Sequence, residues 1–177
     1  SGLNNILFEQ IQSCNKAFSK FIETNYEDLI KKDAHSILSP SVFRNHALPK
    51  LKEHEKVCII IVDCMRCDQF LSVIPYLESL FNIELTYHMS LIPSATPYSR
   101  NAIFSGLYPD ELIKKYPNQK KLFLNNESSL NKYENIFLLD QLKRYNLPNK
   151  RVHYHKIWAI EEGNRFTGEK GGIVTTD

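Results

Sequence analysis

The sequence lacks any apolar run close to the roughly 20 residues that a membrane span requires. Its first residues also lack the basic-then-apolar pattern of a signal peptide, so we expect a cytoplasmic protein with no membrane insertion. Cysteine is scarce as well, and the four cysteines follow no regular spacing: Cys14, Cys58, Cys64 and Cys67. In a chain of 177 residues this usage indicates reduced thiols and argues against a disulfide framework.

An excess of charge of one sign is also missing. The chain has 22 lysines and arginines against 20 aspartates and glutamates, and its formal net charge of +2 is too small to predict broad nucleic-acid binding. Hydrophobic residues make up 42% of the chain and charged residues 24%, which leaves little room for long disorder. A chain of this length buries roughly two thirds of the surface that it exposes when unfolded. We therefore expect one substantial core.

The middle of the chain follows a strand–helix–strand pattern. Residues 57–62 (VCIIIV) are an unbroken, mostly β-branched run, typical of a strand buried on both faces of a parallel sheet. Helical apolar spacing over residues 69–81 and a second strand candidate at 83–91 complete the pattern. Further strands are expected at 152–158 and 172–176. Together they predict an α/β domain with a mostly parallel sheet over residues 57–177.

The first third of the chain has a different pattern. Apolar residues recur at spacings of three and four, which predicts an amphipathic helix over residues 6–32 with a pause near 24–25. Prolines and mixed polarity follow, with a short helix expected at 41–47. Residues 1–56 are therefore expected to form a helical lead-in to the domain.

Two of the expected strands end in aspartate, at Asp63 and Asp177. Because ligands of open α/β sheets bind at the carboxyl ends of the strands, these carboxylates are candidate ligands for Mg²⁺, Mn²⁺ or Zn²⁺. The alternative is that each aspartate only caps the turn or helix that follows its strand.

Thr96 precedes Pro97 at the expected start of a helix that stops at Gly106. A hydroxyl in this position faces free backbone N–H groups and the positive end of the helix dipole, where phosphate binds. Metal coordination would make it a nucleophile, although it could instead serve only as an N-cap. Arg100 and Asn101, in the same first turn, are candidate phosphate ligands, and a salt bridge is the alternative for Arg100.

Residues 62–68 (VDCMRCD) and 93–109 (PSATPYSRNAIFSGLYP) resemble the first two motifs of the PglZ domain, a branch of the alkaline phosphatase superfamily. The similarity is greatest to PorX-type response regulators of Bacteroidetes, in which such a domain follows a receiver domain and a helical linker in signalling to type IX secretion. The resemblance implies a three-layer α/β sandwich and two divalent metal ions, with zinc expected. It also implies that Asp63, Thr96 and Asp177 are metal ligands, and that Thr96 is the nucleophile.

The sequence departs from this family pattern in one respect. The family expects an Asp-x-x-x-His motif for its second metal, and none occurs in this sequence. Only the first residues of the strand-then-Asp-His-Gly motif match, at 174–177 (VTTD). We expect the sequence to be an incomplete part of a longer domain, inactive by itself.

These observations favour a metal-dependent phosphodiesterase that acts on a nucleotide or oligonucleotide through a phospho- or nucleotidyl-threonine intermediate. The expected context is the output domain of a signalling protein, with an upstream receiver domain and with a homodimer as a further possibility. The alternative is a catalytically incomplete module of the same fold that binds secretion-system or regulatory partners.

Overall fold

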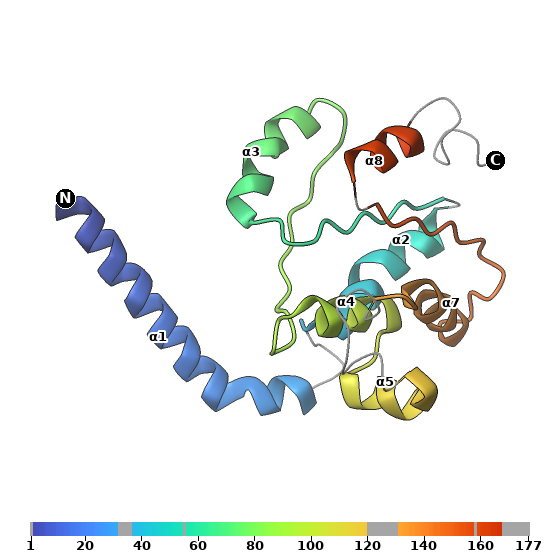
Figure 1. Ribbon diagram of the computed structural model, residues 1–177, viewed down its shortest axis with the longest axis horizontal. Helices are drawn as coiled ribbons and strands as arrows, with labels where there is room; N and C mark the ends of the chain where they lie inside the picture. The colour runs from blue at the N-terminus through green and yellow to red at the C-terminus, as the bar shows by residue number, and fades with distance from the viewer. Residues whose placement is uncertain (1, 32–36, 55, 120–130, 158, 168–177) are drawn as a thin grey trace. The chain divides into compact units, whose positions relative to one another are not determined.

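The computed structural model describes residues 2–31, 37–54, 56–119, 131–157 and 159–167. The chain divides into two compact units, residues 1–141 and 142–177, and the boundary falls within helix α7 (Glu134–Arg144). Figure 1 shows helices joined by irregular segments, with no strand in any of the described ranges. The expected three-layer α/β sandwich with a mostly parallel sheet is therefore wrong for this structure.

The expected strands do not form, because no other described segment pairs with them in a sheet. A buried parallel strand needs neighbours for its backbone N–H and C=O groups and cover for both faces. In the described part of the chain, residues 57–62 have no neighbouring strand and are not covered on both faces, and Ile60 is 79% exposed. The segment 83–91 forms one isolated parallel bridge, between Leu38 and Met89. Residues 152–157 are also irregular, and the strand expected at 172–176 lies outside the described residues.

The helical lead-in begins with α1 (Gly2–Lys31), a continuous helix (Figure 1). The pause expected near 24–25 is absent. The side chains of Thr24 and Asn25 donate hydrogen bonds to carbonyls one turn earlier within the continuous helix. No residue of α1 is buried. Its last turns nevertheless contact a later segment of unit 1, where Tyr26 Oη accepts a 2.8 Å hydrogen bond from the backbone N–H of Ile92.

Short helical turns follow α1: η2 (Ser39–Ser41), the π-helical η3 (Phe43–Ala47) and α2 (Leu48–Glu53). The residue before η2, Leu38, is fully buried with Leu91 and Ala102 in a small apolar core. Ser39 extends this contact, because its hydroxyl oxygen accepts a 3.1 Å hydrogen bond from the N–H of Leu91.

Three further helices of unit 1 carry or surround the two sequence motifs: α3 (Cys67–Leu77), α4 (Thr96–Ser105) and α5 (Pro109–Lys115). Helix α4 begins and ends where the sequence predicts. Its end is set by Gly106, whose φ of +61° lies in the left-handed region that glycine adopts without strain. The side-chain amide of Gln141, on α7, donates hydrogen bonds to the carbonyls of Ile103 and Phe104 in the last turn.

Unit 2 contains the end of α7, irregular residues 151–157 and α8 (Ile160–Thr167). Among the described residues of the whole chain, no helix has the length and apolar character needed to cross a bilayer.

Replacing Gly106 by alanine should destabilise unit 1. The left-handed conformation costs a residue with a Cβ about 1–2 kcal/mol, and a Cβ at this position would lie 2.4 Å from Oε1 of Gln141. We expect the free energy of unfolding in urea to fall by at least this amount. Gly163→Ala is the control, because its Cβ would meet no atom closer than 3.7 Å and alanine favours a helix interior. Equal stability of the two variants would contradict the prediction.

Candidate active site

Asp63 lies in a turn directly after the irregular segment 57–62. The next residue, Cys64, has a φ of +58°, unusual for a side chain with a Cβ. Its backbone N–H donates a 3.0 Å hydrogen bond to Oδ1 of Asp63, which stabilises this turn. The Asp63 carboxylate is 41% exposed and is thus accessible to a ligand.

Thr96 is the first residue of α4, and the N-cap position belongs to Ala95. The N–H groups of Tyr98 and Ser99 both donate to the carbonyl of Ala95, so the N–H of Thr96 precedes the helical hydrogen bonds. No side chain caps this helix start. The alternative that the Thr96 hydroxyl serves only as an N-cap is therefore wrong in this structure.

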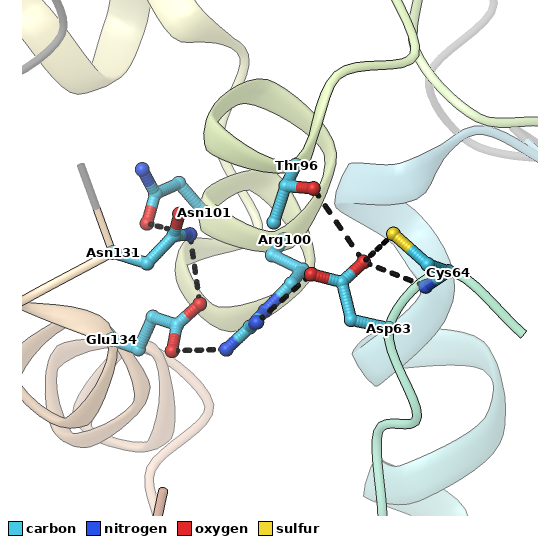
Figure 2. A network of polar contacts seen from close by, with 7 residues as sticks. All are labelled: Asp63, Cys64, Thr96, Arg100, Asn101, Asn131 and Glu134. Atoms are coloured by element: carbon cyan, nitrogen blue, oxygen red, sulfur yellow. Dashed lines mark hydrogen bonds and ion pairs between the residues drawn. The ribbon is translucent and has the colours of Figure 1, made fainter. Parts of the chain in front are cut away.

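The hydroxyl of Thr96 points instead toward Asp63 (Figure 2), and Oγ1 lies 3.5 Å from Oδ1 of that carboxylate. The two residues are 33 positions apart in the sequence. The structure thus brings together two of the three residues expected to bind one metal ion. The third, Asp177, lies outside the described residues.

Arg100 follows Thr96 by one helical turn and connects Asp63 to α7 (Figure 2). Its Nη1 lies 3.2 Å from Asp63 Oδ2, and its Nη2 donates a 2.7 Å hydrogen bond to Glu134 Oε2. Burial lowers the pKa of Arg100, but the carboxylates of Glu134 and Asp63 outweigh it and raise the pKa of the guanidinium above its usual value. Arg100, expected to bind phosphate, therefore has both terminal nitrogens engaged by carboxylates.

Asn101 was the second expected phosphate ligand, and it is 1% exposed. Its side-chain oxygen accepts a 3.4 Å hydrogen bond from Nδ2 of Asn131, which also donates at 2.9 Å to Glu134 Oε1. Figure 2 shows these residues as one network across the first turns of α4 and α7. Asn101 therefore contributes to the support of the site.

Sequence reasoning missed Glu134 and Asn131. An acidic residue at a helix start is ordinarily solvated and stabilises the helix dipole, so nothing marked Glu134 as buried. One signal was present in Arg100 itself: α4 contains no acidic residue, so an ion pair along its own helix was impossible. A partner for Arg100 had to come from another part of the chain.

Whether this site suits a metal ion can be tested on its oxygen atoms. Two ligands at about 2.1 Å from a tetrahedral zinc are separated by about 3.4 Å, close to the observed 3.5 Å between Thr96 Oγ1 and Asp63 Oδ1. Oδ1 faces the hydroxyl, whereas Oδ2 is held by Arg100. Within the described ranges, no cluster of three or more histidine, cysteine, aspartate or glutamate side chains could hold a metal. The spacing of the two oxygens is therefore compatible with two neighbouring ligands of one ion.

The family model for the BREX system PglZ alkaline phosphatase-like domain matches residues 42–171. The chain belongs to the PglZ family. The match covers most of the chain and includes Asp63, Thr96, Arg100 and Glu134. No curated protein matches this PglZ chain. Membership of an alkaline phosphatase-like family points to hydrolase chemistry of the phosphoesterase type.

Removing the charge of Arg100 should destabilise this PglZ domain strongly. The Glu134 side chain is 0% exposed, so Arg100→Met leaves a buried carboxylate without its cation. Breaking a buried ion pair in this way costs about 3–5 kcal/mol. Urea unfolding measures the loss. Arg66→Met is the matched control, because the Arg66–Asp68 pair is exposed and should contribute little. An Arg100→Met protein as stable as the control variant would contradict a structural ion pair.

Proposed function

We propose that this PglZ chain supplies the nucleophile to a metal-dependent phosphoesterase, and that Thr96 attacks the phosphorus of a phosphate ester. The observation that supports this proposal is the approach of Thr96 Oγ1 to Asp63 Oδ1 at the start of α4. A hydroxyl, a carboxylate and a helix N-terminus together form a suitable environment for an anionic phosphoryl group and for a cation.

The chain's own residues would act as follows. Asp63 Oδ1 accepts the hydrogen bond of the Thr96 hydroxyl and orients Oγ1 toward the substrate. The N–H at the start of α4 contacts a phosphoryl oxygen. A bond forms from Oγ1 to phosphorus while the bond from phosphorus to the leaving ester oxygen breaks; the hydroxyl proton passes to solvent, and the leaving alcohol takes up a proton. Water then cleaves the phospho- or nucleotidyl-threonine, releases the phosphorylated product and returns a proton to Oγ1 to restore the hydroxyl.

The proposed metal ligands are Asp63, Thr96 and Asp177, and the proposed cofactor is a pair of divalent ions, with zinc preferred. An ion bound by these residues would lower the pKa of the Thr96 hydroxyl and balance the charge that develops on the phosphoryl oxygens. The local charge suits a cation, since Asp63 and Glu134 contribute two carboxylates against the single guanidinium of Arg100.

For the substrate we propose a phosphodiester, either a nucleotide or an oligonucleotide, by analogy with the PorX-type proteins that the motifs resemble. The same analogy provides the context: a signalling protein with an upstream receiver domain, acting as a homodimer. Both statements depend on a likeness at the level of the family.

A binding module of the same family is the second candidate, and the exposed apolar side chains of α1 favour it. Three phenylalanines of this helix, Phe8, Phe18 and Phe21, are between 46% and 62% exposed. Since a buried phenylalanine contributes about 150–250 Å², their exposure leaves a large surface for a partner. Assays of Thr96 variants discriminate between the candidates, because a pure binding module has no need of that hydroxyl.

In the full-length protein, replacing Thr96 by valine should abolish most hydrolysis and leave the fold intact. Valine keeps the β-branched shape but has no oxygen to form the covalent intermediate, so hydrolysis of bis(4-nitrophenyl) phosphate should fall by about 10³-fold or more. Thr96→Ser should retain part of the activity. Thr24→Val, the same substitution on an exposed position of α1, serves as control. A folded Thr96→Val protein with parental activity would refute the assignment of Thr96 as the nucleophile.

Replacing Asp63 by asparagine should reduce bound zinc as well as activity. The amide is a weaker ligand than the carboxylate and carries no charge to attract the ion. Zinc per chain, measured by mass spectrometry after dialysis, should fall together with the hydrolysis rate. Asp68→Asn, five residues away and paired with Arg66 on the surface, should change neither quantity. Unchanged zinc in the Asp63→Asn protein would exclude this residue as a ligand.

A further inference from the structure

Glu134 is a completely buried carboxylate whose position is fixed on two sides. Its Oε1 accepts a 2.9 Å hydrogen bond from Asn131, three residues earlier, and its Oε2 accepts a 2.7 Å hydrogen bond from Arg100. The side chain is 0% exposed, so water does not compete for these contacts. The proposed mechanism gives this group no role, although it lies in the same network as Asp63 and Thr96 (Figure 2).

The guanidinium of Arg100 transmits the position of Glu134 to Asp63. A guanidinium is planar and rigid, so fixing one terminal nitrogen restricts where the other can lie. Glu134 holds Nη2, and Nη1 then lies 3.2 Å from Asp63 Oδ2. The Nε atom of Arg100 is buried and has no hydrogen-bond partner in the described part of the chain. The orientation of Arg100 therefore depends on its two carboxylate partners.

The orientation of the Asp63 carboxylate depends in turn on Arg100. Because Arg100 holds Oδ2, the other oxygen, Oδ1, faces the hydroxyl of Thr96. Without the hydrogen bond from Arg100 to Oδ2, the carboxylate of Asp63 is free to rotate about its bond to Cβ, and Oδ1 no longer faces the hydroxyl of Thr96. Hydrogen bonds of this kind to a ligating carboxylate typically affect metal affinity or activity by about 10–100-fold.

We propose that Glu134 is a positioning residue that acts through Arg100 to aim Oδ1 of Asp63 at Thr96, an inference that rests on the proposed phosphoesterase function. It assigns Arg100 to the support of Asp63 in place of phosphate binding. Glu134 touches neither the substrate nor the nucleophile. Its loss should therefore reduce turnover and zinc affinity while the affinity for substrate stays close to that of the parent.

The test compares Glu134→Gln with the parent in the full-length protein. Glutamine keeps the size of the side chain but removes the charge that holds Arg100. We expect kcat for bis(4-nitrophenyl) phosphate to fall by about 10–100-fold with KM changed less than about threefold. Zinc affinity, measured by competition with a chromophoric chelator, should fall by about tenfold or more. Asp140→Asn is the matched control, another α7 carboxylate whose partners are Lys115 and Tyr116.

A second variant distinguishes loss of positioning from loss of folding. Arg100→Gln combined with Glu134→Gln removes both charges, so no uncompensated charge stays buried. The double variant should lose activity and zinc affinity to the same extent as Arg100→Gln alone, because both substitutions interrupt one connection. Additive losses, or parental kcat and zinc affinity in a folded double variant, would overturn the proposal.

The outcomes separate this inference from the proposed function. If the parent hydrolyses the diester, Thr96→Val is inactive and Glu134→Gln equals the parent, the phosphoesterase function stands and the positioning role is refuted. If the parent shows no hydrolysis but Glu134→Gln still weakens zinc binding, the proposed reaction fails and the positioning of Asp63 stands. A parent that neither hydrolyses the diester nor binds zinc overturns both.

Discussion

The buried ion pair between Glu134 and Arg100 is the interaction on which the candidate site depends. A carboxylate with no solvent exposure is expensive to desolvate unless a cation lies against it, and Arg100 Nη2 does so at 2.7 Å. The pair ties the start of α7 to the first turns of α4, more than 30 residues away in sequence. Because Arg100 also holds Asp63, the same pair connects three segments of the chain.

Helix α7 contacts α4 at two places with residues from one of its faces. Glu134 and Gln141 are seven residues apart, which places them two turns apart on the same side of a helix. Glu134 binds Arg100, whereas Gln141 binds the carbonyls of Ile103 and Phe104 in the last turn. Phe137, between them on this face, is 2% exposed. The two polar contacts, two turns apart, set the position of α7 along α4 and thereby the position of Glu134.

The parts of the structure that could be predicted from sequence are those set by local chemistry. Pro97 and Gly106 mark the two ends of α4, because a proline in the first turn and a left-handed glycine after the last turn are local requirements. The sheet could not be predicted in this way. The β-branched run at 57–62 indicates extended backbone, yet a strand exists only where another segment pairs with it.

In the candidate site too, residues marked by their own motifs could be predicted from the sequence, whereas residues defined by contacts distant in sequence could not. Asp63 and Thr96 stood out because their motifs place them at ends of expected elements. The structure places their oxygens 3.5 Å apart, and their roles as metal ligand and nucleophile stay predictions. Glu134 could not be found, since its burial depends on Arg100, and a helix-start glutamate is ordinarily exposed. Arg100 was expected to bind an anion, because an arginine beside a helix N-terminus suits phosphate.

Two carboxylates change the role of that arginine. An arginine with a single carboxylate neighbour could exchange it for a phosphate oxygen, but Arg100 has both terminal nitrogens paired, and one partner is buried. Transfer of Arg100 to a substrate would leave the solvent-inaccessible carboxylate of Glu134 uncompensated, which is strongly unfavourable. The guanidinium is therefore retained in the protein, and the excess negative charge beside Thr96 belongs to Asp63. A cation placed there neutralises Asp63 and leaves the Glu134–Arg100 pair intact, whereas a phosphate without a cation would meet an unneutralised carboxylate. In the proposed phosphoesterase, the cation would therefore bind with or before the anionic substrate.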